Sequence, residues 1–497
     1  MKKIVYLLFV IVAILMGCEK KEETLKMVIP IKTGFKSLAP LRDVSASTKG
    51  VMRNMHLGML EYDVDSKEVK EALAKSYFLD EKTKSITMIL REGTKFHNTK
   101  DITIDDIKYS YERVAGKDGK APISSLLSNS LEDIDIINDK TIKMSFNENI
   151  SLSQIIFEVI DTFIIPKDVS EEEQEKKPIG AGPYKFVEYV PGEKIVLSAF
   201  KDFYKGVGDV KEVTFKIFPD TSSQLMAFQA GELDLLQITS DNRKIVEKVS
   251  GSSIYDGLAN DVRTMFLNHE FEAFKNKEVR EAIELGIDKN RLVNILAKDS
   301  GVALSTHMSP YMRDYIENIP IQVKDIVKAK ELLKNSGYEN LSFTLKVVGE
   351  NSFDNTMAVI IKEELSSIGV NVEIHSLPWT NYFTEVYREH NYEAALLQIV
   401  GYPDPYRVLS RYGSMASGNM PQYKNIEIDN LLKEAFNQNS KEEEVKAYKR
   451  IQKILTDEVV SIWIMDQGIS IALSKKFTNY KAYPFTFIDI FNIKKRG

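Results

Sequence analysis

The clearest hydrophobic pattern lies in the second half of the chain. Apolar and polar positions alternate through residues 341–347 and again through residues 370–374, and the apolar positions between them recur at helical spacing. Alternation with a period of two is typical of a half-buried strand, whereas spacing of three and four is typical of an amphipathic helix. A strand, a helix and a strand in this order predict a βαβ unit, which indicates a parallel sheet with a right-handed crossover.

Shorter patterns place mixed α and β elements along the rest of the chain. Strands are predicted over residues 85–90 and 141–146, and a hairpin over residues 186–200. A helix is predicted to begin at Thr103, because an acidic first turn follows it. The fold class is therefore α/β, with separate lobes and a crevice between them. Ligands of such sheets bind beyond the carboxyl ends of the strands.

The N-terminal segment indicates the compartment. Lys2 and Lys3 precede an unbroken apolar run over residues 4–16, which is shorter than the roughly 20 residues that a spanning helix needs. A positive start and a short apolar run are typical of a secretory signal peptide. The run ends in Leu-Met-Gly-Cys at Cys18, which resembles a bacterial lipobox, although Met16 is bulkier than the usual small residue. An ordinary secretory signal with an incidental cysteine is the alternative.

Cys18 is the single cysteine of the chain. We expect residues 1–17 to be a lipoprotein signal peptide and residues 18–26 a charged tether, so that acyl chains on Cys18 hold a soluble body at a membrane. A single cysteine also excludes an internal disulfide and a thiolate metal site. No second apolar run in the sequence is long enough to span a membrane.

The charge balance and the length narrow the function further. The 497 residues include 66 basic and 72 acidic side chains, for a formal net charge of −6, and no dense basic block. Such a mildly acidic chain argues against nucleic acid as a partner. The length exceeds what one hydrophobic core supports, so two or three lobes are expected.

Catalytic motifs are missing from the sequence. There is no Gly-x-Ser-x-Gly elbow, and His269-Glu270 is not followed by the second histidine of a zinc-protease helix. The six histidines are scattered along the chain. The sequence therefore predicts no enzyme, no catalytic residue, no metal ligand and no cofactor, and a surface-anchored hydrolase is the remote alternative.

Six segments carry a family resemblance. They are residues 90–113, 180–184, 215–235, 274–292, 329–338 and 402–405. The first begins Leu-Arg-Glu-Gly-Thr-Lys-Phe-His, the second is Gly-Ala-Gly-Pro-Tyr, and the last is Tyr-Pro-Asp-Pro. In this order they are similar to the family 5 extracellular solute-binding proteins, which serve oligopeptide, dipeptide and nickel ABC importers.

The resemblance implies a two-lobed periplasmic-binding-protein-like fold of type II with an extra inserted subdomain. The expected parts are a discontinuous lobe I at residues 27–65, 175–265 and 469–497, the inserted subdomain at residues 66–174, and lobe II at residues 266–468. The chain is expected to cross between the lobes near Thr264–His269 and near Asp466–Ser470. A cleft of this kind closes because the solute binds the closed state more tightly.

The resemblance also implies a function. The chain is expected to capture a small solute, a peptide before other classes, and to deliver it to the permease of an ABC transporter. A nickel or metal-chelate ligand is the alternative within the same transporter class. The expected partners are the solute, the permease and, through the lipid anchor, a membrane facing the periplasm or the cell exterior. A monomer is expected.

The predicted pocket lies on loops of lobe II. Trp379 and Tyr382 follow the strand over residues 370–375, at the end where ligands bind, and a tryptophan suits a cleft because its flat apolar face carries an N–H donor. The resemblance places residues 402–405 in the binding lobe, and nearby guanidinium groups could hold a ligand carboxylate. The candidate ligand-binding residues are Trp379, Tyr382, Tyr402, Asp404, Arg407, Arg411, Arg388 and Asn268.

One position departs from the peptide-binding relatives. The resemblance implies that their Asp three residues before the Asp-Pro pair binds the α-amino group of the peptide, a task suited to a charge-assisted hydrogen bond. Here Gly401 stands at that position before Asp404 and Pro405. Amine recognition at this position is therefore not expected, and the alternative is a shifted loop in which Asp404 binds the amine.

Overall fold

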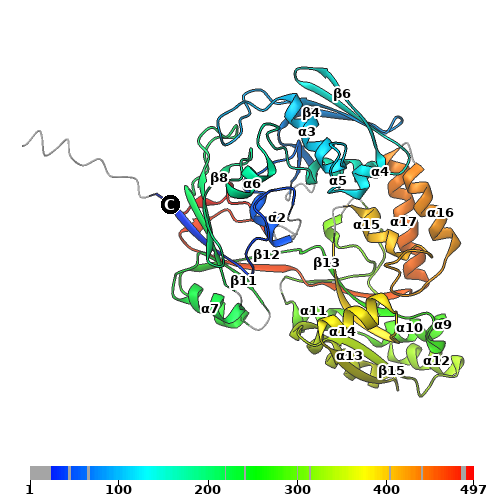
Figure 1. The fold of residues 1–497 in the computed structure, drawn as a ribbon. Helices are drawn as coiled ribbons and strands as arrows, with labels where there is room; N and C mark the ends of the chain where they lie inside the picture. The colour runs from blue at the N-terminus through cyan, green and yellow to red at the C-terminus, as the bar shows by residue number, and fades with distance from the viewer. Residues whose placement is uncertain are drawn as a thin grey trace, which may run out of the picture.

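The computed structural model describes residues 24–42, 46–63, 68–218, 220–239, 242–298, 300–312, 315–401, 404–437, 440–482 and 488–497. The expected signal peptide, Cys18 and the expected binding residue Tyr402 lie outside these residues. No helix within the described ranges is both long and apolar enough to cross a membrane. The described residues form two lobes and an inserted subdomain, each built on its own sheets (Figure 1).

Lobe I contains a four-stranded sheet of order β1-β10-β9-β8 and a three-stranded sheet of order β11-β19-β12. In the first, β1 and β10 are parallel, while β8 and β9 form the hairpin that the sequence predicts. The elements of the lobe are β1 (Lys26–Ile31), β8 (Tyr184–Val190), β9 (Lys194–Ala199), β10 (Glu212–Ile217), β11 (Leu235–Ile238), β12 (Ser252–Gly257), β19 (Ile469–Ser474), β20 (Phe477–Thr478), β21 (Lys494–Lys495), α2 (Ala46–Met52), α7 (Thr221–Gln229) and α8 (Arg243–Val246).

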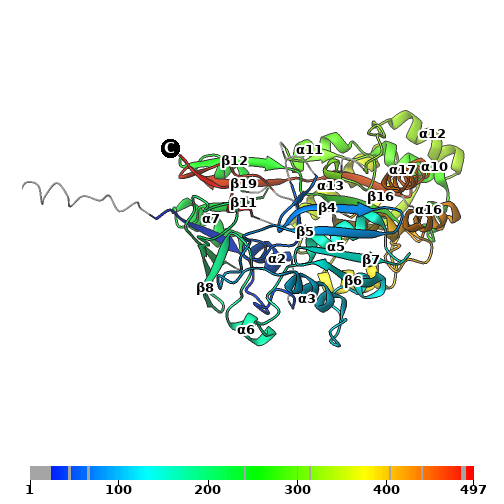
Figure 2. The ribbon, with the colours of Figure 1, turned by 90° about the horizontal axis from the view of Figure 1, so that it is seen from above.

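The inserted subdomain is an antiparallel sheet of order β4-β5-β7-β6, whose strands lie side by side in Figure 2. The helix predicted from Thr103 is confirmed: the Thr103 hydroxyl accepts from the backbone N–H of Asp106, and the Asp106 carboxylate accepts from that of Thr103. The elements are β2 (Leu60–Tyr62), β3 (Val69–Glu71), β4 (Ala74–Asp80), β5 (Ser85–Leu90), β6 (Leu131–Asn138), β7 (Thr141–Phe146), α3 (Ile104–Ala115), α4 (Ser125–Ser130), α5 (Leu152–Asp161) and α6 (Glu171–Lys176).

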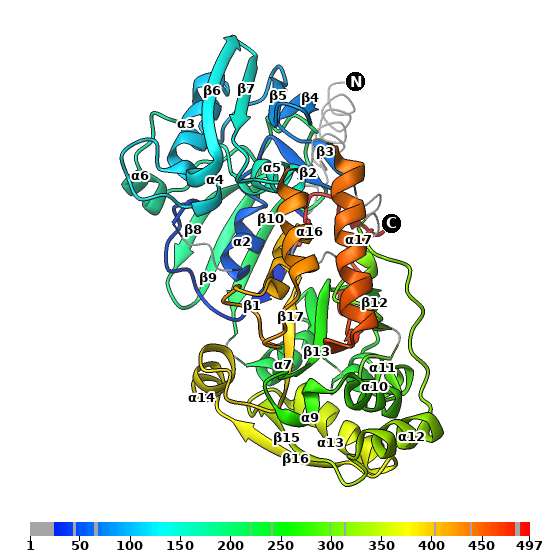
Figure 3. The same ribbon diagram turned by 90° about the vertical axis from the view of Figure 1, so that its right-hand side faces the viewer.

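Lobe II is a six-stranded sheet of order β14-β18-β13-β17-β15-β16 covered by helices. The predicted βαβ unit is confirmed, because β15 and β16 are parallel neighbours and α13 connects them. In Figure 3, α16 and α17 lie side by side and reach the inserted subdomain. The elements are β13 (Asp261–Leu267), β14 (Val302–Ala303), β15 (Ser342–Val348), β16 (Asn371–Leu377), β17 (Ala394–Val400), β18 (Ser461–Asp466), α9 (Glu272–Lys275), α10 (Lys277–Gly286), α11 (Lys289–Leu296), α12 (Ile326–Ser336), α13 (Ser352–Ser366), α14 (Trp379–Tyr382), α15 (Pro405–Leu409), α16 (Ile426–Asn437) and α17 (Lys441–Asp457).

Two short stretches of chain connect the lobes. The first is residues 258–260, between β12 of lobe I and β13 of lobe II. It lies before the expected Thr264–His269, because residues 264–267 already pair with β17 inside the sheet of lobe II. The second is residues 467–468, between β18 and β19, within the expected Asp466–Ser470. In Figure 1 this C-terminal segment, coloured red, passes from one lobe into the other.

Candidate solute-binding cleft

A polar cleft of about 800 Å³ lies between the two lobes. Lobe I contributes Lys32, which follows β1, and Asn242, which follows β11. Lobe II contributes Lys298 after α11 and the start of α13 at residues 350–353. Residues 467–468 of the second crossing form part of the cleft wall, so the cleft borders one of the two connections between the lobes.

Strand direction explains why these loops meet. In lobe II, β15 is parallel to β17, and β17 and β18 are both antiparallel to β13. The carboxyl ends of β15, β17 and β18 and the start of β13 therefore share one edge of the sheet. The cleft lies at this edge, where open α/β sheets bind ligands.

A buried ion pair forms part of the lobe II wall. Arg263 lines the cleft and donates to the Asp354 carboxylate at 2.7 Å and to Gln467 Oε1 at 2.6 Å. Its guanidinium lies over the ring of Phe353, 4.9 Å from the ring centre. Asp354 is fully buried, and burial raises its pKa. Since both charges are committed to each other, this pair positions α13 against the second crossing.

Asp466 holds the two crossings together. Its fully buried carboxylate accepts from the backbone N–H of Ala259 at 3.2 Å, of Asn260 at 3.0 Å and of Gly468 at 2.9 Å. Burial raises the pKa of Asp466, and burial together with the charge of Asp466 raises the pKa of nearby Asp261 to about 6. One side chain thus fixes both connections at the hinge.

The glycine at position 401 has a structural reason. Its N–H donates to the carbonyl of Asn260 at 2.7 Å, and a Cβ at this position would lie 2.0 Å from that oxygen. Any side chain would push β17 away from the first crossing. An Asp at this position would therefore displace the first crossing before it could add a carboxylate to the cleft.

Two predicted binding residues lie together beside the cleft. Trp379 is 51% exposed, stacks on Tyr382 with ring centres 6.3 Å apart, and donates its backbone N–H to Glu350, which lines the cleft. Tyr382 is buried, and its hydroxyl donates to the carbonyl of Leu396. Its hydroxyl is thus engaged in packing lobe II rather than presented to the cleft.

Asp404 and Arg407 lie where lobe II contacts the inserted subdomain. Asp404 is fully buried and caps α15 by accepting from the N–H of Tyr406 at 2.9 Å, while its second oxygen has no partner among the described residues. Burial raises its pKa to about 7. The exposed Arg407 guanidinium lies 5.6 Å from the ring of Phe157 in α5. Both residues therefore face the inserted subdomain.

The other three predicted residues are engaged elsewhere. The Asn268 amide donates to the carbonyls of His390 and Tyr392, Arg388 lies over the ring of Phe383, and Arg411 donates to the carbonyl of its own helical neighbour. None of the seven predicted residues that the structure describes belongs to the lining of the cleft. Their binding role stays a prediction, and the structure does not bring them together.

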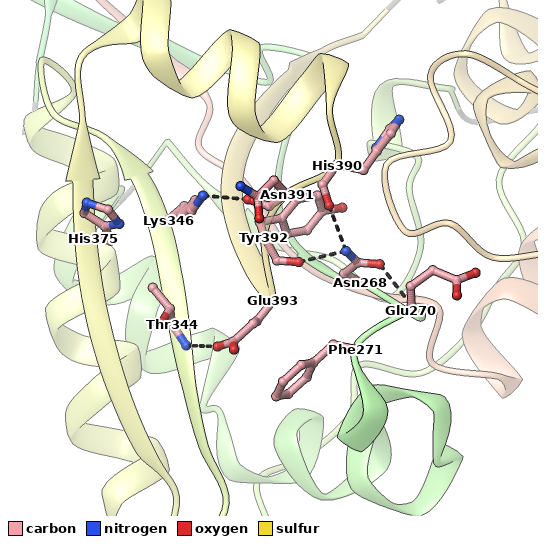
Figure 4. A pocket seen from close by; sticks show the side chains of 10 residues that line it. All are labelled: Asn268, Glu270, Phe271, Thr344, Lys346, His375, His390, Asn391, Tyr392 and Glu393. Atoms are coloured by element: carbon pink, nitrogen blue, oxygen red, sulfur yellow. Dashed lines mark hydrogen bonds between the residues drawn. The ribbon is translucent and has the colours of Figure 1, made fainter.

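A second pocket, of about 400 Å³, lies on the open face of the lobe II sheet (Figure 4). Two of its charged side chains are already paired: Lys346 donates to Glu385 at 2.8 Å, and Glu393 accepts from the backbone N–H of Thr344 at 2.5 Å. Asn268 also lines this pocket, and its side-chain amide is already engaged there because it donates to the carbonyl of Tyr392. It is therefore a weaker candidate than the cleft between the lobes.

Sequence reasoning missed the residues that line the cleft. Lys32, Asn242, Lys298 and Glu350 follow ends of β1, β11, α11 and β15, respectively. The rule that ligands bind beyond the carboxyl ends of strands applies to three of these four positions. Applied to every predicted strand rather than to residues 370–375 alone, it would have found them.

Two α/β lobes joined by two crossings, with a polar cleft at the ends of their strands, define a hinged solute-binding protein of the type II periplasmic-binding fold. The chain belongs to the bacterial extracellular solute-binding proteins, family 5, whose model matches residues 68–420. The oligopeptide-binding protein AppA of Bacillus subtilis is 25% identical over 493 residues, covering 93% of this chain and 89% of the relative. The heme-binding protein A of Haemophilus influenzae is 25% identical over 478 residues, covering 88% and 86%.

Solved structures share the fold. The substrate-binding protein CtaP from Listeria monocytogenes matches with a TM-score of 0.85 at 24% identity, covering 95% of this chain and 99% of that chain. NikA from Brucella suis in complex with Fe(III)-EDTA matches with a TM-score of 0.83 at 18% identity, covering 95% and 100%. The two-lobed architecture expected from the sequence is confirmed.

Proposed function

We propose that this chain captures a peptide in the cleft between its lobes and delivers it to the permease of an ABC importer. The observation that carries the proposal is the cleft itself, which opens at the carboxyl ends of strands from both lobes and borders the crossing between them. Among the family relatives, AppA of Bacillus subtilis is an oligopeptide-binding protein, and a relative from Pseudomonas aeruginosa, 24% identical over 473 residues, is a di/tripeptide-binding protein. A peptide is thus the ligand class with the broadest support.

A metal chelate is the second candidate, favoured by the likeness to NikA bound to Fe(III)-EDTA. The described residues contain no group of three His, Cys, Asp or Glu side chains that could hold a metal ion. A chelated metal would therefore be bound through its organic part. The family is one of solute-binding proteins, and we propose no catalytic activity for the chain.

The location and the lobe boundaries belong to the same proposal. The family is extracytoplasmic, and lipidation of Cys18 would keep a monomeric body at a membrane facing the periplasm or the cell exterior. Residues 27–65, 175–257 and 469–497 would move as lobe I with residues 66–174, against residues 261–466 as lobe II, so the boundary expected at residue 265 is proposed instead at the first crossing.

Native mass spectrometry of the purified protein with its carried-over solute tests the ligand class. We expect masses of short peptides, and calorimetry with synthetic copies should reproduce the binding. Solution scattering should show a smaller radius of gyration with the bound peptide, because closure brings the lobes together. A metal-containing mass would favour the chelate instead, and intact binding without compaction would contradict the hinge.

A further inference from the structure

Two fully buried carboxylates lie where lobe II contacts the inserted subdomain. Asp404 is at the start of α15 and Glu444 is in the first turn of α17, and neither side chain is exposed. Both helices belong to lobe II, and both pack against α5 of the inserted subdomain (Figure 1). Any movement of lobe II away from the subdomain therefore uncovers these two acids.

Each of the two carboxylates has one oxygen without a partner. Asp404 Oδ1 accepts from the backbone N–H of Tyr406 at 2.9 Å, and Glu444 Oε1 accepts from the hydroxyls of Ser153 at 2.6 Å and Tyr448 at 2.9 Å. Asp404 Oδ2 and Glu444 Oε2 make no hydrogen bond to any described residue. A buried carboxylate with an unsatisfied oxygen is costly when ionised and far less costly when neutral. The geometry therefore favours a proton on the pair.

The charged groups around the pair do not offset both acids. Lys84 faces Glu444, but its ammonium donates to the carbonyl of Ile150 at 2.8 Å and burial lowers its pKa. The exposed Arg407 faces Asp404, while α5 contributes a third buried acid, Glu158, whose pKa burial raises to about 7. The remaining neighbours are Gln154, Glu148 facing Lys84, Tyr406, and Asp161 paired with Lys49 and Arg53.

We propose that this junction is a proton-dependent latch, in which a proton on the Asp404–Glu444 pair holds lobe II against α5 and its loss releases lobe II. The inference goes beyond the proposed function, because it concerns the protein without solute. With the proton, the pair carries at most one negative charge. Without it, two like charges lie close together where water is excluded. Opening the junction lets water reach both carboxylates, so the open state binds the proton less tightly than the closed state does.

The direction of the pH dependence follows from burial. Burial raises the pKa of Asp404 to about 7 and also raises the pKa of Glu444. In an open junction, a hydrated aspartic acid would titrate near its ordinary value of about 4. The closed junction is thus favoured at low pH, and this advantage is lost as the pH rises to about 7. The equilibrium constant for opening should rise by at most about tenfold per pH unit in this window and level off above it.

Fluorescence energy transfer between the two parts of the junction tests the latch. The chain carries Cys18→Ser, so that dyes attach only to introduced cysteines at two exposed positions, Asn149→Cys in the inserted subdomain and Lys433→Cys in α16 of lobe II. We expect transfer in the solute-free protein to fall as the pH is raised from roughly 5 to 8. A second pair, Lys433→Cys with Lys362→Cys in α13, lies within lobe II and should show constant transfer.

Asp404→Asn separates the proton from the helix cap, because the asparagine oxygen can still accept from the N–H of Tyr406. We expect this variant to keep high transfer over the whole pH range. Glu444→Gln removes the neighbouring charge and should reduce the pH dependence. Asp220→Asn makes the same substitution at the exposed start of α7 and should behave like the parent. Melting curves show whether each variant is folded, and if Asp404→Asn is not, Glu444→Gln decides.

Two results would overturn the latch. One is constant transfer between the subdomain and lobe II in the parent, and the other is a pH dependence that Asp404→Asn and Glu444→Gln both retain in full. Glu158→Gln examines the third acid of the junction: if it alone removes the pH dependence, the assignment to the Asp404–Glu444 pair is wrong. None of these measurements involves a solute, so their outcome is independent of the proposed peptide function.

Discussion

Lobe II meets the rest of the molecule at two places with opposite chemistry. At its junction with the inserted subdomain, the fully buried Glu444 carboxylate of α17 accepts from the hydroxyl of Ser153 at 2.6 Å, at the start of α5. Asp404 is equally buried beside it. In the cleft, by contrast, Lys32 and Lys298 are exposed and the Asn242 amide has no partner among the described residues. The junction is buried within the protein, although the second oxygens of Glu444 and Asp404 have no partner among the described residues, whereas the cleft is open to a solute.

The difference shows how the energy of closure is divided. Any rotation of lobe II about the two crossings must move or break the contacts of the junction. These contacts therefore determine the free-energy difference between the open and closed states of the protein without solute. The solute then adds only the interactions that the cleft lacks. A ligand shifts such an equilibrium by its difference in affinity for the two states, so a solute that contacts both walls of the cleft favours closure.

The largest effect is expected from Arg263→Met in the wall of the cleft. The variant leaves the fully buried Asp354 without its partner, and breaking a buried pair costs ~3–5 kcal/mol. Denaturant unfolding measures the loss. Arg407→Met at the junction is the matched control and should cost about 1 kcal/mol or less, because its guanidinium is exposed. An equal loss of unfolding free energy in both variants would contradict the distinction between the buried ion pair and the exposed guanidinium.

Gly401→Ala is expected to come next. Its Cβ would lie 2.0 Å from the carbonyl oxygen of Asn260, so β17 and the first crossing must move apart, at a cost of roughly 1–3 kcal/mol. Gly251→Ala is the control, because no atom lies within 4 Å of its added Cβ. Melting temperatures should separate the two variants. Scattering should also show altered closure for Gly401→Ala alone, and unchanged compaction would argue that position 401 does not touch the hinge.

The pH dependence of stability probes the junction. Burial raises the pKa of Asp404 from 3.8 to about 7, so the folded protein holds a proton that the unfolded chain releases between these values. Stability contributed by this group is thus fully present below pH ~4 and falls as the pH rises to about 7. The fall should be on the order of 1–2 kcal/mol, less than the full shift implies at ~1.4 kcal/mol per unit, because the buried Glu444 carboxylate interacts with Asp404 and its own pKa is also raised.

Asp404→Asn should remove this slope, since the neutral amide has no proton to lose. Unfolding measured at several pH values compares the variant with the parent. Asp220→Asn, at the exposed start of α7, is the control and should leave the slope in this range in place. A slope that survives in Asp404→Asn would assign it to another buried acid, of which Glu158, with a pKa also near 7, is the first to examine.

The fold could be predicted from regular local patterns in the sequence. The candidate site could not, because it depends on contacts between segments that are distant in the chain. The βαβ unit over residues 341–374 follows from alternation and helical spacing, which are local. Burial of Asp404 depends on α5, which belongs to a different part of the chain, and no local pattern encodes that contact. The close approach of Gly401 to Asn260 gives a structural reason for the glycine that no local pattern predicts, and the expected lack of amine recognition there stays a prediction. No local pattern marks Lys32 and Lys298 as cleft residues, except that the first follows a strand and the second a helix.

Trp379→Ala is expected to have the smallest effect on stability and the most informative effect on binding. The indole is half exposed and stacks on Tyr382, so its removal should cost about 1 kcal/mol or less. The backbone hydrogen bond to Glu350 remains in the variant, which keeps this loop at the edge of the cleft. If the ring covers the bound peptide, calorimetry should show the peptide binding roughly tenfold more weakly, the equivalent of ~1.4 kcal/mol. Met415→Ala removes another exposed apolar side chain of lobe II, 95% exposed and outside the lining, and should leave binding unchanged. Equal binding by the two variants would place Trp379 outside the site, and the solute would then contact lobe II without this aromatic ring.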